Sequence, residues 1–271
     1  MRKYIEPVFM IGLALLLGLT FKSEEDLYQG DMAVIVNEPS VWQLDRHTLE
    51  GDTIIHIAYD PFFNTSKSYR AFPLASNLRL FLGDKINTAS LDVIFKCADG
   101  YKPHMPLEKV LAGNGYLAYH DMEAPEGKHW PDSLAETLSP FYLVWPDVDP
   151  QIKDYARPYA LLGAEFKSVT EEFAAAIPQA SEHLEGYELF NNTCMTCHSV
   201  NKAGGNKAPE FNYPKNITEY WTKENIWLFI QNPTSFRYSS QMPAMTAIDR
   251  EAFEKIYAYL ESMKGQKLRE N

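Results

Sequence analysis

Cys194-Met195-Thr196-Cys197-His198 is the stretch of this 271-residue chain that says most about its fold. A Cys-x-x-Cys-His sequence is the attachment signature of a c-type haem. The two thiols, three positions apart, reach the two vinyl groups of one porphyrin, and the adjacent imidazole binds the iron as the proximal ligand. The sequence therefore predicts one covalent haem, held by Cys194 and Cys197, with His198 as an axial ligand.

Two other kinds of site also use a Cys-x-x-Cys pair, namely a redox dithiol and half of a zinc site. A zinc site needs a second pair of soft ligands, but the chain has only one further cysteine, the distant Cys97. A redox dithiol would normally follow a strand in a βαβ context. Both alternatives fit the sequence less well than haem attachment.

A second axial ligand is expected in the segment Gln241-Met242-Pro243-Ala244-Met245. A low-spin electron-transfer haem needs a ligand on its far side, and a methionine thioether is one such ligand. Methionines in an apolar stripe usually fill a core, but this segment is polar and contains proline. Met242 is the expected ligand, with Met245 as the alternative.

Two helices are expected in the last third of the chain. The first runs from Lys223 to Gln231 and is stopped by Pro233. The second runs from Arg250 to Lys264 and has apolar residues at helical intervals, so that one face packs inward. The residues of this apolar face are Phe253, Ile256, Tyr257 and Leu260.

From about residue 182 to residue 264 the chain resembles a class I cytochrome c domain. That family begins with a helix that carries a glycine and, four residues later, an aromatic residue, here Gly186 and Phe190. The helix crosses a last helix that bears an aromatic residue, here Tyr257 or Tyr259. The resemblance implies an all-α fold for this part of the chain.

The same resemblance implies two contacts of the cofactor. Pro209 would supply a carbonyl group to the axial imidazole. Trp221 or Arg237 would approach a haem propionate, with ordinary packing around the porphyrin as the alternative for Trp221.

The N-terminus has the pattern of an export signal. Residues 1–3 include two positive charges, residues 8–21 form an uncharged apolar run, and residues 22–26 are polar. The run spans about 21 Å as a helix, short of the roughly 30 Å hydrocarbon layer, which favours cleavage. No small-x-small cleavage site stands out, which favours retention of residues 4–21 as an anchor. Residues 1–26 are therefore expected to be a signal peptide or a membrane anchor, with the uncleaved anchor as the preferred interpretation.

Composition places the remainder among globular proteins. With 45% hydrophobic and 23% charged residues, the chain can bury two cores of ordinary size. The formal net charge of −11 argues against partners such as nucleic acid or anionic lipid surfaces. An acidic face would suit a basic redox partner, although the charge could equally serve only to keep an exported protein soluble.

Residues 27–178 have the pattern of an α+β domain, which a polar boundary separates from a cytochrome domain at 182–268. Leu91, Val93 and Phe95 alternate with polar or opposite-facing positions, as in a half-buried strand that ends at Cys97. Further strands are expected at residues 53–59, 115–120, 141–145 and 159–169, and short helices at 74–82 and 107–111.

Short segments of this domain resemble the molybdopterin-binding fold of sulfite oxidases in their order and spacing. These segments are Tyr69-Arg70-Ala71-Phe72-Pro73-Leu74, Cys97-Ala98-Asp99-Gly100-Tyr101, Leu117-Ala118-Tyr119 and Ser139-Pro140-Phe141-Tyr142-Leu143-Val144-Trp145-Pro146. In that family a cysteine well upstream of the Asp-Gly-Tyr element holds the metal. No cysteine precedes Cys97 in this chain, so we expect a degenerate relative without molybdopterin, and Cys97 as a buried core residue.

Copper is a further alternative, because several soft ligands occur in the same domain. They are Cys97, His104, Met105, His120 and Met122. Blue copper sites combine two histidines, a cysteine and a weak methionine. The step from Cys97 to His104 is too long for the tight ligand loop of such proteins, so copper is not expected.

Together these features predict a bacterial, periplasm-facing cytochrome with one haem that passes single electrons between respiratory partners. Those partners would be a membrane respiratory complex or a periplasmic dehydrogenase. We expect an electron carrier rather than an enzyme, with residues 27–178 as a cofactor-free docking domain. The alternative is a molybdenum-dependent, sulfite-oxidase-like dehydrogenase with a fused haem c as electron acceptor.

Overall fold

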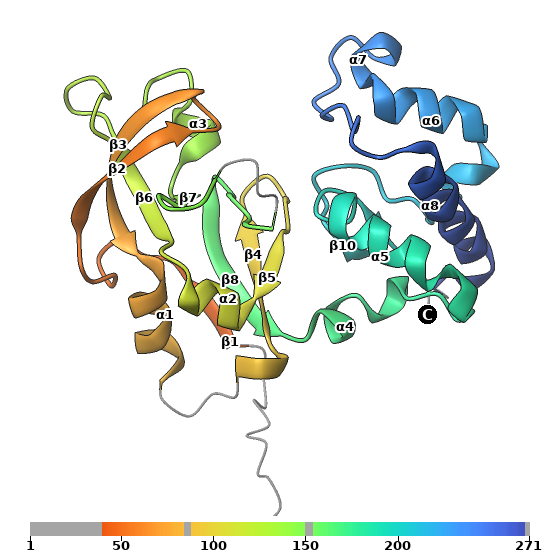
Figure 1. Ribbon diagram of the computed structural model, residues 1–271, viewed down its shortest axis with the longest axis horizontal. Helices are drawn as coiled ribbons and strands as arrows, with labels where there is room; N and C mark the ends of the chain where they lie inside the picture. Colours follow the sequence, from red (N-terminus) through yellow and green to blue (C-terminus); the bar gives the residue numbers. More distant parts are fainter. Residues whose placement is uncertain (1–39, 84–87, 150–153, 269–271) are drawn as a thin grey trace, which may run out of the picture. The chain divides into compact units, whose positions relative to one another are not determined.

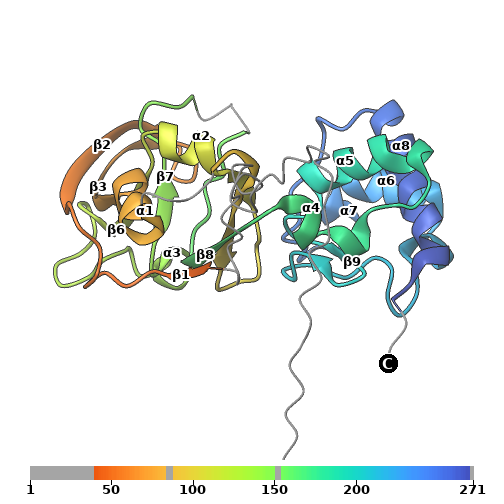
Figure 2. The ribbon, with the colours of Figure 1, turned by 90° about the horizontal axis from the view of Figure 1, so that it is seen from below.

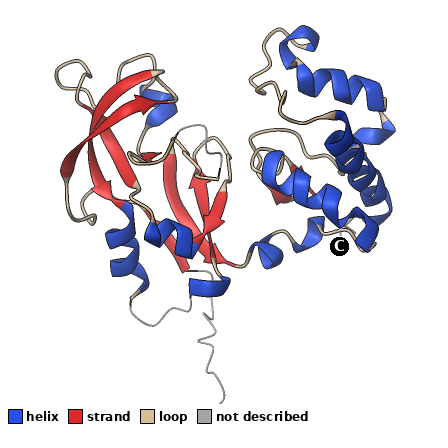
Figure 3. Ribbon diagram, in the orientation of Figure 1, coloured by secondary structure: helices blue, strands red, loops and turns tan. Residues whose placement is uncertain are grey.

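The computed structural model describes residues 40–83, 88–149 and 154–268, and these stretches belong to one unit. The predicted signal peptide or anchor, residues 1–26, lies outside the described residues. Within the described ranges, no helix is long and apolar enough to cross a lipid bilayer. Strands dominate the first part of the chain and helices the second (Figure 3).

The described strands of the first part form two antiparallel four-stranded sheets (Figure 1). One sheet has the order β1-β8-β4-β5 and consists of β1 (Ser40–Gln43), β8 (Leu161–Lys167), β4 (Asp92–Cys97) and β5 (His104–Pro106). The other has the order β2-β3-β6-β7 and consists of β2 (Thr53–Asp60), β3 (Thr65–Pro73), β6 (Tyr116–Asp121) and β7 (Tyr142–Val144). All five predicted strands are present, with ends that differ from the prediction by at most two residues.

Strand β4 shows why the alternation of residues along the sequence predicted this strand correctly. Val93, Phe95 and Cys97 are buried in one hydrophobic cluster, as their alternation predicts. Lys96 is exposed. Ile94 is also buried, which the alternation does not predict, because the strand is covered on both faces at that point.

Strand β3 was missed because the first half of its sequence is polar. It pairs with β2 on one side and β6 on the other, so its central residues are buried despite a lysine among them. Lys67 Nζ lies 2.7 Å from an Asp121 carboxylate oxygen and 2.9 Å from a Glu123 carboxylate oxygen. Pairing with two carboxylates lets a charged residue occupy a strand interior, and sequence periodicity does not detect this.

Two short helices follow strands that end in proline. Helix α1 (Leu74–Leu82) follows β3, and α2 (Leu107–Ala112) follows β5; α2 extends one residue beyond the prediction. Each is succeeded by glycine. The two helices pack against each other, as Figure 2 shows from below. A third helix, α3 (Ala135–Leu138), was not predicted.

The described second part of the chain is mainly helical. Its helices are α4 (Val169–Glu172), α5 (Leu184–Thr193), α6 (Lys223–Gln231), α7 (Pro233–Phe236) and α8 (Arg250–Ser262). The predicted all-α fold needs one correction, a two-residue antiparallel ladder between β9 (Ser199–Val200) and β10 (Ala203–Gly204). The turn that joins them places Asn201 and Lys202 at φ 55° and 66°, which is the geometry that two-residue hairpin loops prefer.

Helices α5 and α8 lie side by side in both views (Figures 1 and 2). A Cβ atom at Gly186 would lie 2.2 Å from the Lys255 carbonyl oxygen, so the close approach requires glycine. The Tyr259 ring lies 5.5 Å from that of Phe190 and 5.7 Å from that of Tyr187. Of the two aromatic residues proposed for the crossing, Tyr259 is therefore the one that contacts α5.

The predicted apolar face of the last helix is confirmed. Its four residues, Phe253, Ile256, Tyr257 and Leu260, are all buried in one cluster with Phe190 and Met195. The helix ends at Ser262 and continues as a 3-10 turn over Met263–Gln266. This core is separate from the clusters of the two sheets.

Candidate haem-binding site

The cysteine pair and the histidine lie on a turn that continues the C-terminal end of α5. The backbone N–H of Cys194 donates to Phe190 O at 2.8 Å, and those of Cys197 and His198 donate to Cys194 O at 3.1 Å and 2.9 Å. These hydrogen bonds therefore fix the direction of the turn relative to the end of α5. Residues 194–212, which begin here, are called the Cys-His loop below.

The His198 imidazole is held on two sides. Its Nδ1 lies 2.8 Å from Pro209 O, the contact that the family resemblance implied. Because a carbonyl only accepts, Nδ1 carries the proton and Nε2 carries the lone pair that could bind a metal. Burial lowers the pKa of His198, although the Pro209 carbonyl opposes this shift. The side chain is thus a neutral imidazole of fixed tautomer.

Phe211 provides the second support and was missed by the sequence analysis. Its ring stacks on that of His198 at a centroid distance of 4.1 Å and an angle of 25°. An aromatic residue in a polar loop gives no periodic signal, so the sequence offered nothing to single it out. The hydrogen bond and the ring contact together restrict rotation of the imidazole.

The two thiols of the motif are available for attachment. Cys194 and Cys197 are partly buried and form no disulfide. Burial raises the pKa of Cys194 to about 11 and also raises the pKa of Cys197. Burial therefore favours the protonated form of both thiols, and addition of an S–H group across a vinyl group gives a thioether.

The two candidate methionines differ in their surroundings. Met245 is tied to the core, since its N–H donates to Ile230 O at 2.7 Å and its side chain packs against the α5–α8 cluster. Met242 is not part of that cluster, and its N–H donates to Ser240 Oγ at 3.3 Å. Met242 and Met245 are both half-buried, and Met245 packs against the same cluster as Cys194.

A family model described as cytochrome c matches residues 184–264. The C-terminal part of this chain is a cytochrome c domain. Such a domain implies a covalently bound haem c, and the match covers the Cys-His loop, Met242 and the α5–α8 crossing. The match begins at the first residue of α5 and ends two residues after α8.

One curated relative is similar to part of the chain. The chain is similar to cytochrome c oxidase subunit 2 of Alkalihalophilus pseudofirmus, with 31% identity over 113 residues. The alignment covers 39% of this chain and 33% of the relative. The chain therefore spans about a third of the length of the curated relative it matches.

The side chains of the cytochrome c domain fit a haem. Besides the thiols and the imidazole, large apolar side chains near α7 face solvent, Phe236 with 44% and Tyr238 with 96% of their surface exposed. The Arg237 guanidinium lies 5.9 Å from the Trp221 ring centroid, so the two residues named for a propionate contact are neighbours.

The Cys-His loop of the cytochrome c domain also contacts residues 99–102, the Asp-Gly-Tyr element of the sheet region. Lys102 N donates to Thr196 O at 2.8 Å, and Asn206 N donates to Gly100 O at 3.1 Å. Lys207 forms an ion pair with Asp99. None of these contacts was predicted, because they join segments that are about 100 residues apart.

Cys97 lies where a core residue was expected. It packs in the cluster of the first sheet, and burial raises the pKa of its thiol to about 12. The other candidate copper ligands are divided between the two sheets, with His104 and Met105 on β5 and His120 on β6. In the described ranges no group of three or more His, Cys, Asp or Glu residues is placed to hold a metal ion.

Proposed function

We propose that this protein is a c-type cytochrome with one haem that transfers single electrons between respiratory partners. The observation that carries the proposal is the Cys-x-x-Cys-His turn of a cytochrome c domain, with His198 Nδ1 donating to Pro209 O. This hydrogen bond leaves Nε2 with the lone pair that an axial ligand needs. Cys194 and Cys197 would hold the porphyrin, and His198 and Met242 would ligate the iron.

When bound, haem supplies a one-electron couple at its iron. The chain has three roles toward it. The thiols would hold the group in place, the Pro209 carbonyl and the Phe211 ring orient the imidazole, and apolar side chains of α6 and α7 would exclude water. A methionine thioether as second ligand raises the reduction potential, which suits the high-potential end of a respiratory chain.

A membrane respiratory complex is the favoured partner. The relative is named as a subunit of cytochrome c oxidase, and the net charge of −11 favours a basic docking surface over nucleic acid. A periplasmic dehydrogenase is the alternative partner. We place the protein in the bacterial periplasm, anchored to the inner membrane if residues 4–21 are retained.

The sheet region would act as a docking or scaffold domain without its own cofactor. Its resemblance to the molybdopterin-binding fold of sulfite oxidases suggests its origin. Cys97 lies in the hydrophobic core with a raised thiol pKa, which suits a packing role better than metal ligation. The contacts of residues 99–102 with the Cys-His loop favour a role in supporting the haem.

The test is metal analysis of the full chain after export and haem maturation, with molybdenum supplied. One iron per polypeptide, a low-spin His/Met spectrum and no molybdenum or copper would support the proposal. Stoichiometric molybdenum or copper beside the iron would overturn it in favour of a dehydrogenase with a fused haem. A chain that carries no iron after maturation would overturn both.

A further inference from the structure

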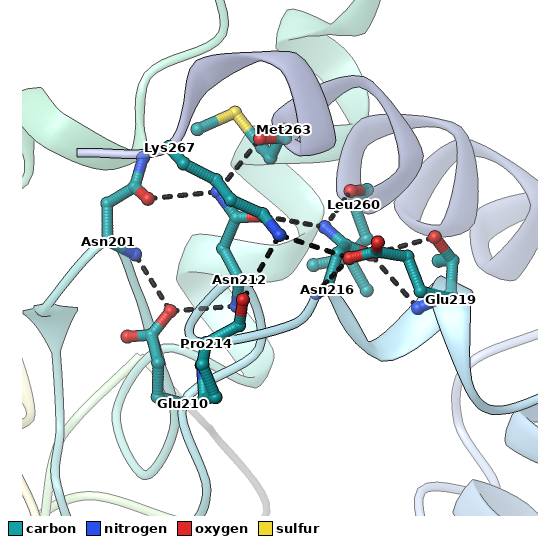
Figure 4. A network of polar contacts seen from close by, with 10 residues as sticks. Asn201, Glu210, Asn212, Pro214, Asn216, Glu219, Leu260, Met263 and Lys267 are labelled. Atoms are coloured by element: carbon teal, nitrogen blue, oxygen red, sulfur yellow. Dashed lines mark hydrogen bonds and ion pairs between the residues drawn. The ribbon is translucent and has the colours of Figure 1, made fainter. Parts of the chain in front are cut away.

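Three buried asparagines, two of them in the Cys-His loop, form a continuous hydrogen-bonded ladder (Figure 4). Asn216 Nδ2 donates to Asn212 Oδ1, and Asn212 Nδ2 donates to Asn201 Oδ1, both at 2.9 Å. At most 3% of the surface of any of these residues is exposed. Burying three polar side chains is costly unless every group is paired, and we call this set the asparagine ladder.

Each of the three amides also donates to a backbone carbonyl in the last turn of α8 or just after it. Asn216 Nδ2 donates to Leu260 O at 2.7 Å, and Asn212 Nδ2 donates to Met263 O at 2.8 Å. Asn201 Nδ2 donates to Gln266 O at 2.7 Å and to Ala175 O at 2.9 Å. The last carbonyls of a helix have no partner within it, so the ladder caps α8 and ties the Cys-His loop to it.

Glu210 joins the ladder to the turn between β9 and β10. Its Oε1 accepts from Asn201 N at 2.9 Å and Asn212 N at 2.8 Å, and its Oε2 accepts from Lys202 N at 3.0 Å. Asn201 and Lys202 both have a left-handed backbone, which asparagine tolerates but which is unfavourable for lysine. One carboxylate therefore holds three backbone N–H groups and stabilises a strained turn.

This arrangement also anchors the carbonyl that binds the histidine. Glu210 directly follows Pro209, whose carbonyl lies 2.8 Å from His198 Nδ1. Glu210 forms a parallel bridge with Ser199, and Phe211 N donates to Ser199 O at 2.8 Å. Pro209 is therefore held between the histidine on one side and the Glu210 hydrogen bonds on the other.

We propose that Glu210, with the two ladder residues that it binds, Asn201 and Asn212, acts as a set of positioning residues for the axial histidine. They set the direction and length of the Nδ1–H···O hydrogen bond, and through it the basicity of the imidazole. Hydrogen bonds to the outer nitrogen of a metal-binding histidine raise its basicity, and a more basic ligand favours ferric over ferrous iron. The inference rests on the proposed haem function.

The experiment compares Glu210→Gln with Glu219→Gln in the full chain carrying haem. Each variant removes one negative charge from a carboxylate that accepts a backbone N–H, but Glu219 accepts from Asn216 N and pairs with Lys267, at the far end of the ladder. At a fixed solution potential, we expect the ratio of reduced to oxidised protein to be at least about threefold higher in Glu210→Gln than in Glu219→Gln. This corresponds to about 28 mV for a one-electron couple.

A second readout is solvent exchange of the His198 Nδ1 proton, measured by nuclear magnetic resonance. It should be at least about threefold faster in Glu210→Gln than in Glu219→Gln, since a looser loop breaks the Pro209 hydrogen bond more often. Equal potentials and equal exchange in the two variants would overturn the inference and leave the network a purely structural role.

Should Glu210→Gln not accumulate as a folded protein, Asn201→Gly replaces it. Glycine suits the left-handed backbone and keeps the N–H to Glu210 while deleting one rung of the ladder. Lys202→Gly in the same turn is the control. Faster Nδ1 exchange in Asn201→Gly alone supports the inference, and equal exchange overturns it. Wild-type chain that takes up no haem would contradict the proposed function instead, so the two failures are distinguishable.

Discussion

At the residue scale, the two proposed axial ligands differ in how firmly the polypeptide holds them. His198 is fixed by the Pro209 carbonyl at 2.8 Å and by the Phe211 ring at 4.1 Å. Met242 lies on a polar loop, and its backbone donates to Ser240 Oγ at 3.3 Å. The polypeptide by itself therefore fixes the orientation of His198, whereas the orientation of Met242 depends more on the bound haem.

Replacing Met242 with alanine should abolish the low-spin His/Met spectrum and lower the reduction potential, because the thioether is the ligand that raises it. Met245→Ala is the matched control from the same loop. It should keep the native spectrum and lose about 1 to 2 kcal/mol of stability, since Met245 packs against the core. Visible spectra and redox titration check both variants. A native spectrum in Met242→Ala and its loss in Met245→Ala would reverse the assignment.

At the element scale, strand β8 is joined to the neighbouring strand β4 by an ion pair as well as by backbone hydrogen bonds. Glu165 of β8 lies 2.7 Å from Lys96 Nζ on the neighbouring β4 and 2.8 Å from Lys167 Nζ two residues along its own strand. Burial by itself would raise the pKa of Glu165, but the hydrogen bonds from Lys167 and Lys96 outweigh it and lower the pKa to about 2.

This shift predicts a pH-dependent effect of Glu165→Gln. The folded pKa lies below the ordinary value of 4.5, so the charged group stabilises the fold fully above that pH. Its contribution is lost as the pH falls through about 2. The variant should be less stable by about 1 to 2 kcal/mol at pH 7, below the full value of the shift because Lys96 is partly exposed.

Urea unfolding between about pH 7 and pH 2 measures this difference. The difference in the free energy of unfolding between wild type and Glu165→Gln should disappear at the acidic end of the range. Glu126→Gln, which changes an exposed loop carboxylate, should show no such difference. If the difference in the free energy of unfolding stayed constant over this pH range, packing rather than charge would account for it.

At the scale of the whole molecule, residues 99–102 and the Cys-His loop meet although they are far apart in sequence. Gly100 lies at the centre of this contact with φ +81°. A Cβ atom there would lie 1.9 Å from Asn206 Oδ1 and 3.0 Å from Lys207 N. Glycine is needed both for the backbone conformation and for the close approach.

Gly100→Ala should therefore weaken this contact. Gly127→Ala is its matched control, because Gly127 has a similar φ of +77° but no neighbour within 4 Å of its Cβ position. Both variants lose about 1 to 2 kcal/mol to the left-handed backbone. Only Gly100→Ala should also speed hydrogen exchange at the Asn206 and Lys102 amides, which donate across the contact. Equal exchange in both variants would mean that the contact contributes nothing to stability.

The sequence alone determined the features that depend on neighbours along the chain. The Cys-x-x-Cys-His motif named the attachment residues of the proposed haem, periodicity located strands such as β4 and the buried face of α8, and proline or glycine marked helix ends. These signals are local, because alternation and helical spacing are set by the geometry of a single strand or helix.

Only the tertiary structure decided the contacts between distant segments. It buried Lys67 in β3 by supplying Asp121 and Glu123, stacked Phe211 on His198, and paired the Asn212 side chain with the carbonyl of Met263, just after the last helix. A polar residue in a loop has the same local pattern whether it is solvated or buried. What distinguishes the two is a partner far away in the chain, and the position of that partner exists only once the chain has folded.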